Sequence, residues 1–337
     1  MSYAAHVGVM IKEAVAALAP KQGGIYVDAT TGGGGYTRAI LAAADCTVYG
    51  FDRDPTAIDR ARGWAAEFGD RLHLINRPFS EMQEAMNENG IDAVDGVVFD
   101  LGVSSMQLDE AKRGFSFRQE GPLSMRMDGG KPDASDIVAE AGVKDLAAIF
   151  KTYGEEKKAG QIARAIVAAR EIAPVTTTTQ LAAIIEKAAP VYGKSRIHPA
   201  TRVFQALRIF VNDELGQLTA GLRAAEKLLR PAGRLVVVTF HSLEDRIVKR
   251  FFSSRSAEQP KGSRHAPPSE KPIASFALIS AKVLIPDDDE VARNPRARSA
   301  KLRAGARLDG PPAPENGDAL GAPRPISMST PEKGKNK

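Results

Sequence analysis

The chain has 337 residues, of which 43% are hydrophobic and 26% charged. This composition is typical of a folded globular protein and excludes a disordered or fibrous chain. The net charge of +5 is compatible with a polyanionic partner but does not require one. One cysteine excludes an internal disulfide, and no apolar run approaches the roughly 20 residues that cross a bilayer. We therefore expect a cytoplasmic protein of about two domains, without a membrane span.

The first hundred residues alternate between short apolar runs and helical patterns. An amphipathic helix around Val9 to Leu18 opens the chain. Strands are predicted at residues 25–29, 47–52, 72–76 and 96–100, with helices between them at 36–44, 55–68 and 80–89. This alternation indicates βαβ units in a parallel sheet, which binds ligands at the carboxyl ends of its strands.

The alternation stops between residues 106 and 198, where only helical patterns are found. It resumes with a helix at about 199–229, a strand at 234–240, a helix at 243–252 and strand-like runs at 276–285 and 300–307. We expect a discontinuous α/β domain (1–105 and 199–309) that contains an all-helical insert (106–198) for substrate recognition. Residues 253–272 and the Pro/Gly-rich tail, 310–337, are predicted to be disordered.

Four consecutive glycines, residues 32–35, follow the first predicted strand. Glycine at a strand-to-helix turn lets the backbone approach a ligand closely. The third glycine of a dinucleotide fingerprint is missing, because Thr37 stands in its place. Asp28 instead precedes Gly32 by four residues, which is similar to the glycine-rich loop of S-adenosylmethionine methyltransferases.

The following strands also end in residues suited to a nucleoside ligand. Asp52 can accept hydrogen bonds from both ribose hydroxyls; the alternative is a helix N-cap, a role that Asp54 also fits. Phe79 could form one wall of an adenine pocket or be the first core residue of the next helix. Asp100 ends the fourth strand, where this fold places its chemistry.

The cysteine content limits the chemistry. Methylation of a pyrimidine at C5 usually requires an attacking thiolate, and Cys46 stands at the start of a strand, at the sheet edge opposite the ligand. An exocyclic amine needs no covalent step. DNA amino methyltransferases often bind the amine through an Asp, Asn or Ser that is followed by two prolines and an aromatic residue. Asp100 occupies the first position of this motif but is followed by Leu-Gly-Val instead. This difference argues against a DNA enzyme and leaves the catalytic residues unassigned.

Metal chemistry is not expected. The five histidines are scattered, and His241 has no partner at the spacing of metal ligands. The acidic run at residues 287–290 is predicted to be a solvated loop.

Several longer motifs belong to one pattern. They are DATTGGGGY from Asp28, FDLGVSS from Phe99, GFSFR from Gly114, MRMD from Met125, YGEE from Tyr153, HPATRVFQALR from His198, FHSLEDR from Phe240 and NPRARSAKLR from Asn294. Together they resemble the bacterial small-subunit ribosomal RNA cytosine-N4 methyltransferases, over about His6 to Arg307. Two positions differ: Gly8 replaces the usual proline and Tyr36 the usual histidine.

The resemblance implies a Rossmann-like class I methyltransferase domain with a mostly parallel seven-stranded sheet and S-adenosylmethionine as cofactor. It also implies a target cytosine in 16S ribosomal RNA, in the decoding region near the peptidyl site. A DNA, other RNA or small-molecule methyltransferase and a non-catalytic RNA-binding protein remain alternatives. The cofactor-binding residues that it implies are Gly34, Gly35, Tyr36, Asp52, Phe79, Asp100 and Gln107.

The insert and the residues after it carry candidate RNA contacts. Phe115 and Phe117, among Arg113, Arg118 and Arg126, could stack on a base. Cations where the chain re-enters the core could contact phosphates; they are Lys194, Arg196, Arg202 and Arg208. The alternative is that the phenylalanines are core residues of a helical subdomain and the arginines its solvated face.

Overall fold

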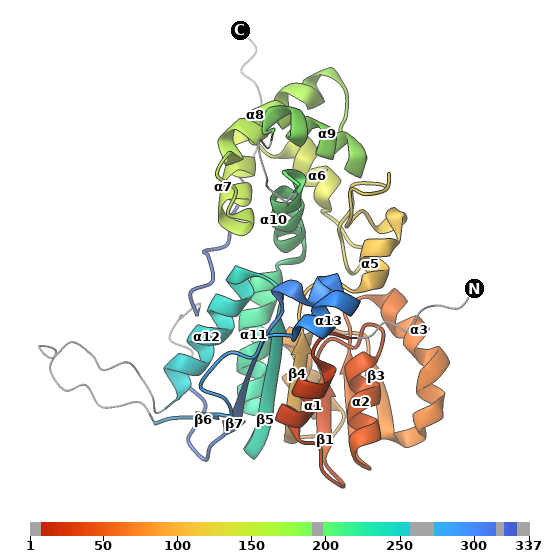
Figure 1. Cartoon of the computed structure of the whole chain (residues 1–337), viewed down its shortest axis with the longest axis vertical. Helices are drawn as coiled ribbons and strands as arrows, with labels where there is room; N and C mark the ends of the chain where they lie inside the picture. Colours follow the sequence, from red (N-terminus) through yellow and green to blue (C-terminus); the bar gives the residue numbers. More distant parts are fainter. Residues whose placement is uncertain (1–7, 191–197, 257–272, 315–319, 329–337) are drawn as a thin grey trace, which may run out of the picture. The chain divides into compact units, whose positions relative to one another are not determined.

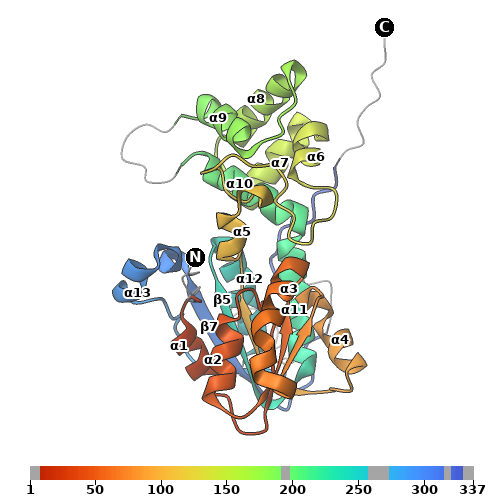
Figure 2. The same ribbon diagram turned by 90° about the vertical axis from the view of Figure 1, so that its right-hand side faces the viewer.

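The computed structural model describes residues 8–190, 198–256, 273–314 and 320–328. These residues form two compact units, drawn in Figures 1 and 2. One unit comprises residues 1–102 and 216–322, and the other residues 103–215 and 323–337. The first is an α/β unit and the second a helical unit.

The α/β unit is built on a seven-stranded sheet in the order β3-β2-β1-β4-β5-β7-β6. Neighbouring strands from β3 to β5 are parallel, whereas β7 is antiparallel to both β5 and β6. The expected α/β class and mostly parallel sheet are therefore confirmed. The strands are β1 (Ile25–Asp28), β2 (Thr47–Phe51), β3 (Leu72–Ile75), β4 (Val94–Asp100), β5 (Leu229–Thr239), β6 (Phe276–Leu278) and β7 (Lys301–Arg307).

Helices cover both faces of this sheet (Figure 1). Side chains alternate along a strand, so Val236 and Val238 pack into one apolar cluster with α1 (Ile11–Leu18) and α2 (Gly35–Ala43). On the other face, two glycines allow helices to pack closely. Gly221 lies in α11 (Glu214–Leu228), and Gly305 lies in β7, beneath α12 (Ser242–Arg255). A Cβ at Gly221 would lie 2.6 Å from Phe79, and one at Gly305 2.6 Å from Phe252. The remaining helices here are α3 (Pro55–Ala65), η1 (Ala66–Arg71), η2 (Phe79–Glu81), α4 (Met82–Glu88), α13 (Asp288–Arg293) and η4 (Pro295–Ser299).

The helical unit contains no strand within residues 103–190 and 198–215. Its helices pack around buried side chains such as Leu146, Phe150 and Ile162 (Figure 2). None of the helices in the described ranges has the length and apolar sequence of a membrane span. The elements are α5 (Ser105–Asp109), η3 (Ala111–Arg113), α6 (Ala134–Glu140), α7 (Val143–Gly154), α8 (Ala159–Ile172), α9 (Thr178–Ala188) and α10 (Ala200–Asn212).

Two elements near the return to the α/β unit differ from the prediction. The single helix expected at 199–229 is two helices, because Asp213 adopts a left-handed conformation (φ 47°) between α10 and α11. Helix α10 belongs to the helical unit, which therefore extends beyond the expected boundary at residue 198. The strand expected at 276–285 ends at Leu278, and only Leu284 forms a further bridge, to Leu302.

The acidic run at residues 287–290 is largely exposed, as predicted, but it begins a helix instead of forming a loop. Asp287 is the N-cap of α13 and accepts a hydrogen bond from the Glu290 amide at 2.6 Å. Acidic residues suit this position because the first turn of a helix exposes unpaired amide groups. The Glu290 carboxylate in turn accepts from the Met10 amide, 280 residues away, also at 2.6 Å. The start of the 253–272 segment, which was also expected to be disordered, is helical, since α12 continues to Arg255.

The C-terminal tail is anchored rather than disordered at two described points. Buried Glu226 accepts hydrogen bonds from Arg255 Nε (2.6 Å), Ser275 Oγ (2.6 Å) and the Ala313 amide (3.1 Å). Further on, the Leu320 side chain is only 1% exposed. One buried carboxylate therefore joins α11, α12 and the tail, which the local composition of the tail could not reveal.

We predict that Glu226→Ala strongly destabilises the fold. The substitution leaves the buried Arg255 guanidinium without its counter-charge, which typically costs about 3–5 kcal/mol. Urea unfolding followed by circular dichroism measures the loss. The control is Glu67→Ala. The Glu67 carboxylate is exposed and lies 3.9 Å from Arg38 Nη1, and a surface ion pair of this kind contributes little to stability. Equal unfolding midpoints for the two variants would contradict the prediction.

Candidate active site

Three aspartates lie at the carboxyl ends of adjacent parallel strands. Asp28 ends β1, Asp52 follows β2, and Asp100 ends β4. Strand β1 lies between β2 and β4, so Asp28 stands between the two other carboxyl groups. Strands in a sheet are about 4.8 Å apart, which brings the three tips within about 10 Å. The sheet thus gathers Asp52 and Asp100, two of the predicted cofactor residues, at one edge.

The glycine-rich loop connects these strand tips. The Thr31 amide donates to the Phe51 carbonyl at 2.8 Å, and the Gly32 amide donates to Asp52 Oδ2 at 2.9 Å. Gly32 and Gly34 have φ values of 47° and 80°, in the left-handed region where glycine is favoured. Gly35 then begins α2. The glycines therefore allow the tight turn that aims backbone amides at the second strand.

Asp52 is oriented as a hydrogen-bond acceptor. Its Oδ1 accepts from the Asp54 amide at 2.8 Å and its Oδ2 from Gly32, which leaves one further acceptor site on each oxygen. Burial raises the pKa of this carboxyl to about 6, although both amide bonds act in the opposite direction. Asp54 takes the N-cap role, because its Oδ1 accepts from the Thr56 amide at 3.0 Å. Asp52 is thus available for a ligand.

Asp28 and Asp100 make the same edge acidic. Asp28 is buried and accepts from Thr37 Oγ1 at 2.6 Å and from the Thr30 amide at 3.1 Å. Thr30 Oγ1 accepts from the Asp100 amide at 2.7 Å, while buried Asp100 Oδ1 has no hydrogen-bond partner among the described residues. Burial, and then the Asp28 and Glu244 carboxylates, raise the pKa of Asp100 well above its usual value. A cationic ligand would relieve this concentration of carboxyl groups.

Two other predicted cofactor residues have core contacts. Tyr36 is 3% exposed, and its hydroxyl donates to the Val9 carbonyl. Phe79 packs edge-to-face on Phe99, with ring centroids 5.3 Å apart, and lies close to Gly221. These contacts are the ones expected if Phe79 is the first core residue of the next helix. The cofactor roles of both residues stay predictions.

Gln107 belongs to the helical unit and forms a helix cap. Its Oε1 accepts from the Ser104 amide at 3.0 Å, and Ser104 Oγ accepts from the Gln107 amide at 3.2 Å. This reciprocal capping box begins α5. A cofactor contact by Gln107 stays a prediction.

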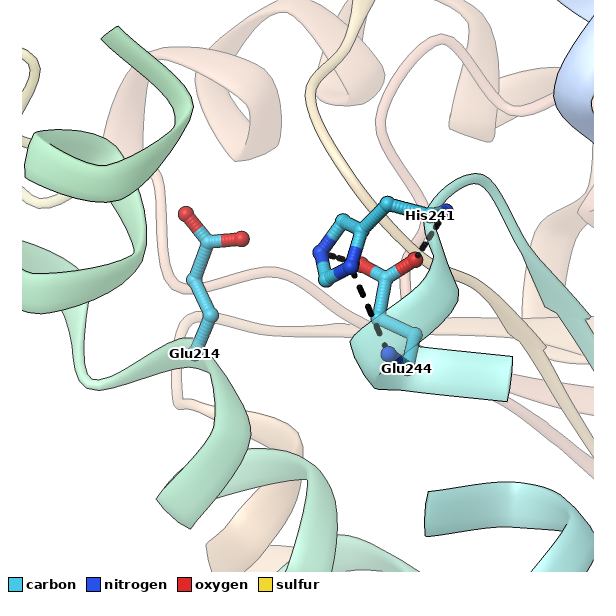
Figure 3. Close-up of side chains that lie close together, drawn as sticks. All are labelled: Glu214, His241 and Glu244. Atoms are coloured by element: carbon cyan, nitrogen blue, oxygen red, sulfur yellow. Dashed lines mark hydrogen bonds and ion pairs between the residues drawn. The ribbon is translucent and has the colours of Figure 1, made fainter. Parts of the chain in front are cut away.

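His241 and Glu244 form a second capping arrangement, at the start of α12 (Figure 3). His241 Nδ1 accepts from the Glu244 amide at 3.3 Å, and Nε2 lies 3.0 Å from Glu244 Oε1. Glu244 Oε2 accepts from the amides of Phe240 and His241 at 2.8 and 3.1 Å. His241 therefore has a side-chain partner in Glu244, whereas the prediction had considered only partners at the spacing of metal ligands. The i, i+3 spacing to a glutamate, typical of a capping box, was the missed signal; the absence of a metal stays an expectation.

Most arginines proposed as RNA contacts have structural partners. Arg113 Nη2 donates to the Met127 carbonyl at 2.9 Å. Arg126 pairs with both oxygens of Asp128 at 2.8 and 2.6 Å. Phe115, which Arg113 approaches, is 6% exposed. These contacts favour the alternative that Phe115 is a core residue, and they show that the two arginines brace the loop before α6.

The remaining RNA candidates divide into four groups. Arg208 forms a two-bond ion pair with Glu214, at 2.8 and 2.9 Å. Phe117 is half-buried against His198 and Phe204, with ring centroids 4.7 and 4.9 Å away. Arg118 is exposed and Arg202 is half-buried, so both stay candidates, whereas Lys194 and Arg196 lie outside the described residues.

Residues 3–308 match the sequence model of the MraW methylase family. The chain belongs to this family. Similar methylases are named "Ribosomal RNA small subunit methyltransferase H". The protein of that name from Nitrobacter hamburgensis is 55% identical over 319 residues, covering 94% of this chain and 95% of its own. Those from Nitrobacter winogradskyi and Parvibaculum lavamentivorans are 56% and 53% identical, covering 90% and 94% of this chain and 91% and 93% of their own.

We predict that Gly34→Ala disrupts the loop of this methylase. A Cβ there would lie 2.2 Å from Trp64 Cζ2, at a φ that disfavours alanine. Strain and overpacking of this kind cost about 1–3 kcal/mol each. Gly63→Ala is the control: nothing lies within 4 Å of its Cβ, and a helical alanine stabilises by up to about 1 kcal/mol. The unfolding temperature should therefore fall for Gly34→Ala and rise for Gly63→Ala. A shift of both temperatures in the same direction would contradict the prediction.

Proposed function

We propose that this methylase transfers a methyl group from S-adenosylmethionine to the N4 amine of a cytosine in small-subunit ribosomal RNA. The target lies in the decoding region near the peptidyl site, and the reaction takes place in the cytoplasm. The observation that carries the proposal is the acidic site at the carboxyl ends of the parallel strands in a MraW methylase. Asp52 and Asp100 lie there, with no thiol beside them.

The residues at this edge fit the cofactor. S-adenosylmethionine, when bound, supplies a methyl group made electrophilic by a sulfonium. Asp52 would accept hydrogen bonds from the ribose hydroxyls through the free acceptor sites on its two oxygens. Asp28 and Asp100 favour a positively charged ligand, and Asp100 Oδ1 lacks a partner among the described residues. The loop that contains Gly32 and Gly34 allows close approach of the backbone.

The position of the single cysteine supports an amine as the methyl acceptor. Cys46 is 3% exposed, and its thiol lies 3.7 Å from the Ile40 carbonyl. It precedes β2, whereas Asp52 follows that strand; six residues of extended chain span about 20 Å. A thiolate at Cys46 therefore cannot reach a base held beside Asp52. An amine attacks the methyl group directly and needs no enzyme nucleophile.

We predict that cofactor affinity falls in acid through Asp52. Only the ionised carboxyl offers all its acceptor sites, and its pKa is raised to about 6. Below pH 6 the dissociation constant of S-adenosylhomocysteine should rise about tenfold per pH unit, with release of a proton on binding, whereas above pH 7 it should be constant. Calorimetry in buffers of different ionisation enthalpy measures both quantities.

The matched variants for this experiment are Asp52→Asn and Asp59→Asn. The first should bind weakly and lose the acid-dependent change. Asp59 is exposed on α3, so its variant should keep the wild-type profile. A flat wild-type profile between pH 5 and 7 would exclude Asp52 as the acceptor.

We predict that Cys46→Ala keeps full activity and that the product is N4-methylcytidine. Small ribosomal subunits from cells that lack this protein are the substrate, and nucleoside mass spectrometry identifies the product. Asp52→Ala is the inactive control. Formation of 5-methylcytidine, or an RNA adduct at Cys46, would be incompatible with the proposed reaction.

A further inference from the structure

Helix α12 and the segment that ends in β7 are rich in cations. Residues 291–307 contain six arginines and lysines and no acidic residue, and residues 246–255 contain four and none. Two of these cations, Arg255 and Arg307, are buried. Most of the others are at least partly exposed at the surface of the α/β unit, where like charges close together cost stability unless a partner neutralises them.

Lys301 and Arg303 are held on the face of β7 that packs against α12. Lys301 Nζ lies 3.0 Å from Asp245 Oδ2, and Arg303 Nε lies 2.8 Å from Asp245 Oδ1. Both cations lower the pKa of this one carboxylate. Lys249 is exposed and stands one helical turn after Asp245, on the same side of α12. Lys301 and Arg303 thus share one carboxylate, and Lys249 adds a further exposed positive charge, so this part of the surface stays positively charged.

The sheet register places these cations beside the candidate active site. Asp100 pairs with Val238 in β5, and the next residue, Thr239, pairs with Lys301 in β7. Lys301 therefore lies two strands from Asp100, or about 10 Å. Exposed Arg298 lies in η4, directly before β7, at this same end of the strands. This separation is of the order of one or two nucleotides along an RNA backbone.

We infer that Lys249, Arg298, Lys301 and Arg303 form a phosphate-binding surface for the RNA strand that carries the target base. This α12–β7 surface deepens the proposed function and rests on it. The ion pairs with Asp245 already restrain the side chains of Lys301 and Arg303, so that less side-chain entropy is lost when phosphates bind. Because phosphate contacts carry no sequence information, the surface positions the strand, and the active site selects the base.

The test compares two variants that each remove two positive charges from the α/β unit. Lys249→Gln with Lys301→Gln alters the surface and leaves Arg303 paired with Asp245. The control, Arg62→Gln with Lys227→Gln, changes exposed cations on α3 and at the end of α11. Arg298→Gln is a third protein, which keeps the test valid should the first variant fold poorly. Binding to small ribosomal subunits is measured from 0.05 to 0.3 M salt.

The surface variant should bind about tenfold more weakly at 0.15 M salt, with a salt slope lower by about 1.4, and Arg298→Gln should lower the slope by about 0.7. S-adenosylhomocysteine affinity should not change in any of the three proteins. The surface is refuted if both the double variant (Lys249→Gln with Lys301→Gln) and Arg298→Gln keep the affinity and salt slope of the control. Wild-type protein that transfers no methyl group to small subunits refutes the proposed function instead, so the two failures are distinguishable.

Discussion

The hydrogen bond from the Gly32 amide to Asp52 joins the tips of the first two strands, and the rest of the active site depends on it. The amide can reach the carboxylate because the loop adopts left-handed conformations that glycine permits. On the other side of β1, Thr30 binds Asp28 through its amide and Asp100 through its hydroxyl. One short loop therefore orients the carboxylates of Asp28 and Asp52 and holds the backbone of Asp100 before any ligand arrives.

This arrangement is electrostatically costly. Burial is the largest cause that raises the pKa of each of the three carboxyls, and Asp28 raises that of Asp100 further. A raised pKa means that the folded state disfavours the charged form, so the ionised site opposes folding above that pKa. A ligand that brings a positive charge recovers part of this cost on binding. The proposed sulfonium cofactor has that property, whereas a neutral nucleoside has not.

The parts of the fold that sequence reasoning could predict depend on local pattern. Apolar runs that end in Asp28, Asp52 and Asp100, each close to a glycine or proline, were sufficient to predict the parallel strands and their ligand edge. The break at Asp213 has no such signal, because an aspartate adopts the left-handed conformation where glycine would be expected. The anchoring of the tail depends on Glu226, 87 residues before Ala313, and only tertiary structure reveals it.

Arginines illustrate the same limit at the site. Arg113, Arg126 and Arg208 were predicted to be RNA contacts, yet their guanidinium groups bind carbonyls and carboxylates of their own unit. Sequence alone cannot distinguish an arginine that braces a loop from one that faces a phosphate, since the partner of each guanidinium is set by the tertiary structure. Net charge has the same weakness, because it does not show which cations are paired with a carboxylate and which are free.

The order of the strands explains how one sheet edge can serve ligands of opposite charge. Strands β2, β1 and β4 bring aspartates to the edge, and β5 separates them from the lysine and arginine of β7. The acidic part suits a cationic methyl donor, and the basic part suits the phosphates of the acceptor strand. In the proposed reaction, the base that receives the methyl group lies between them, at the carboxyl ends of β4 and β5. There, Asp100 ends one strand and the Phe240–Glu244 segment follows the other, so the residue that takes the amine proton should be sought among these groups.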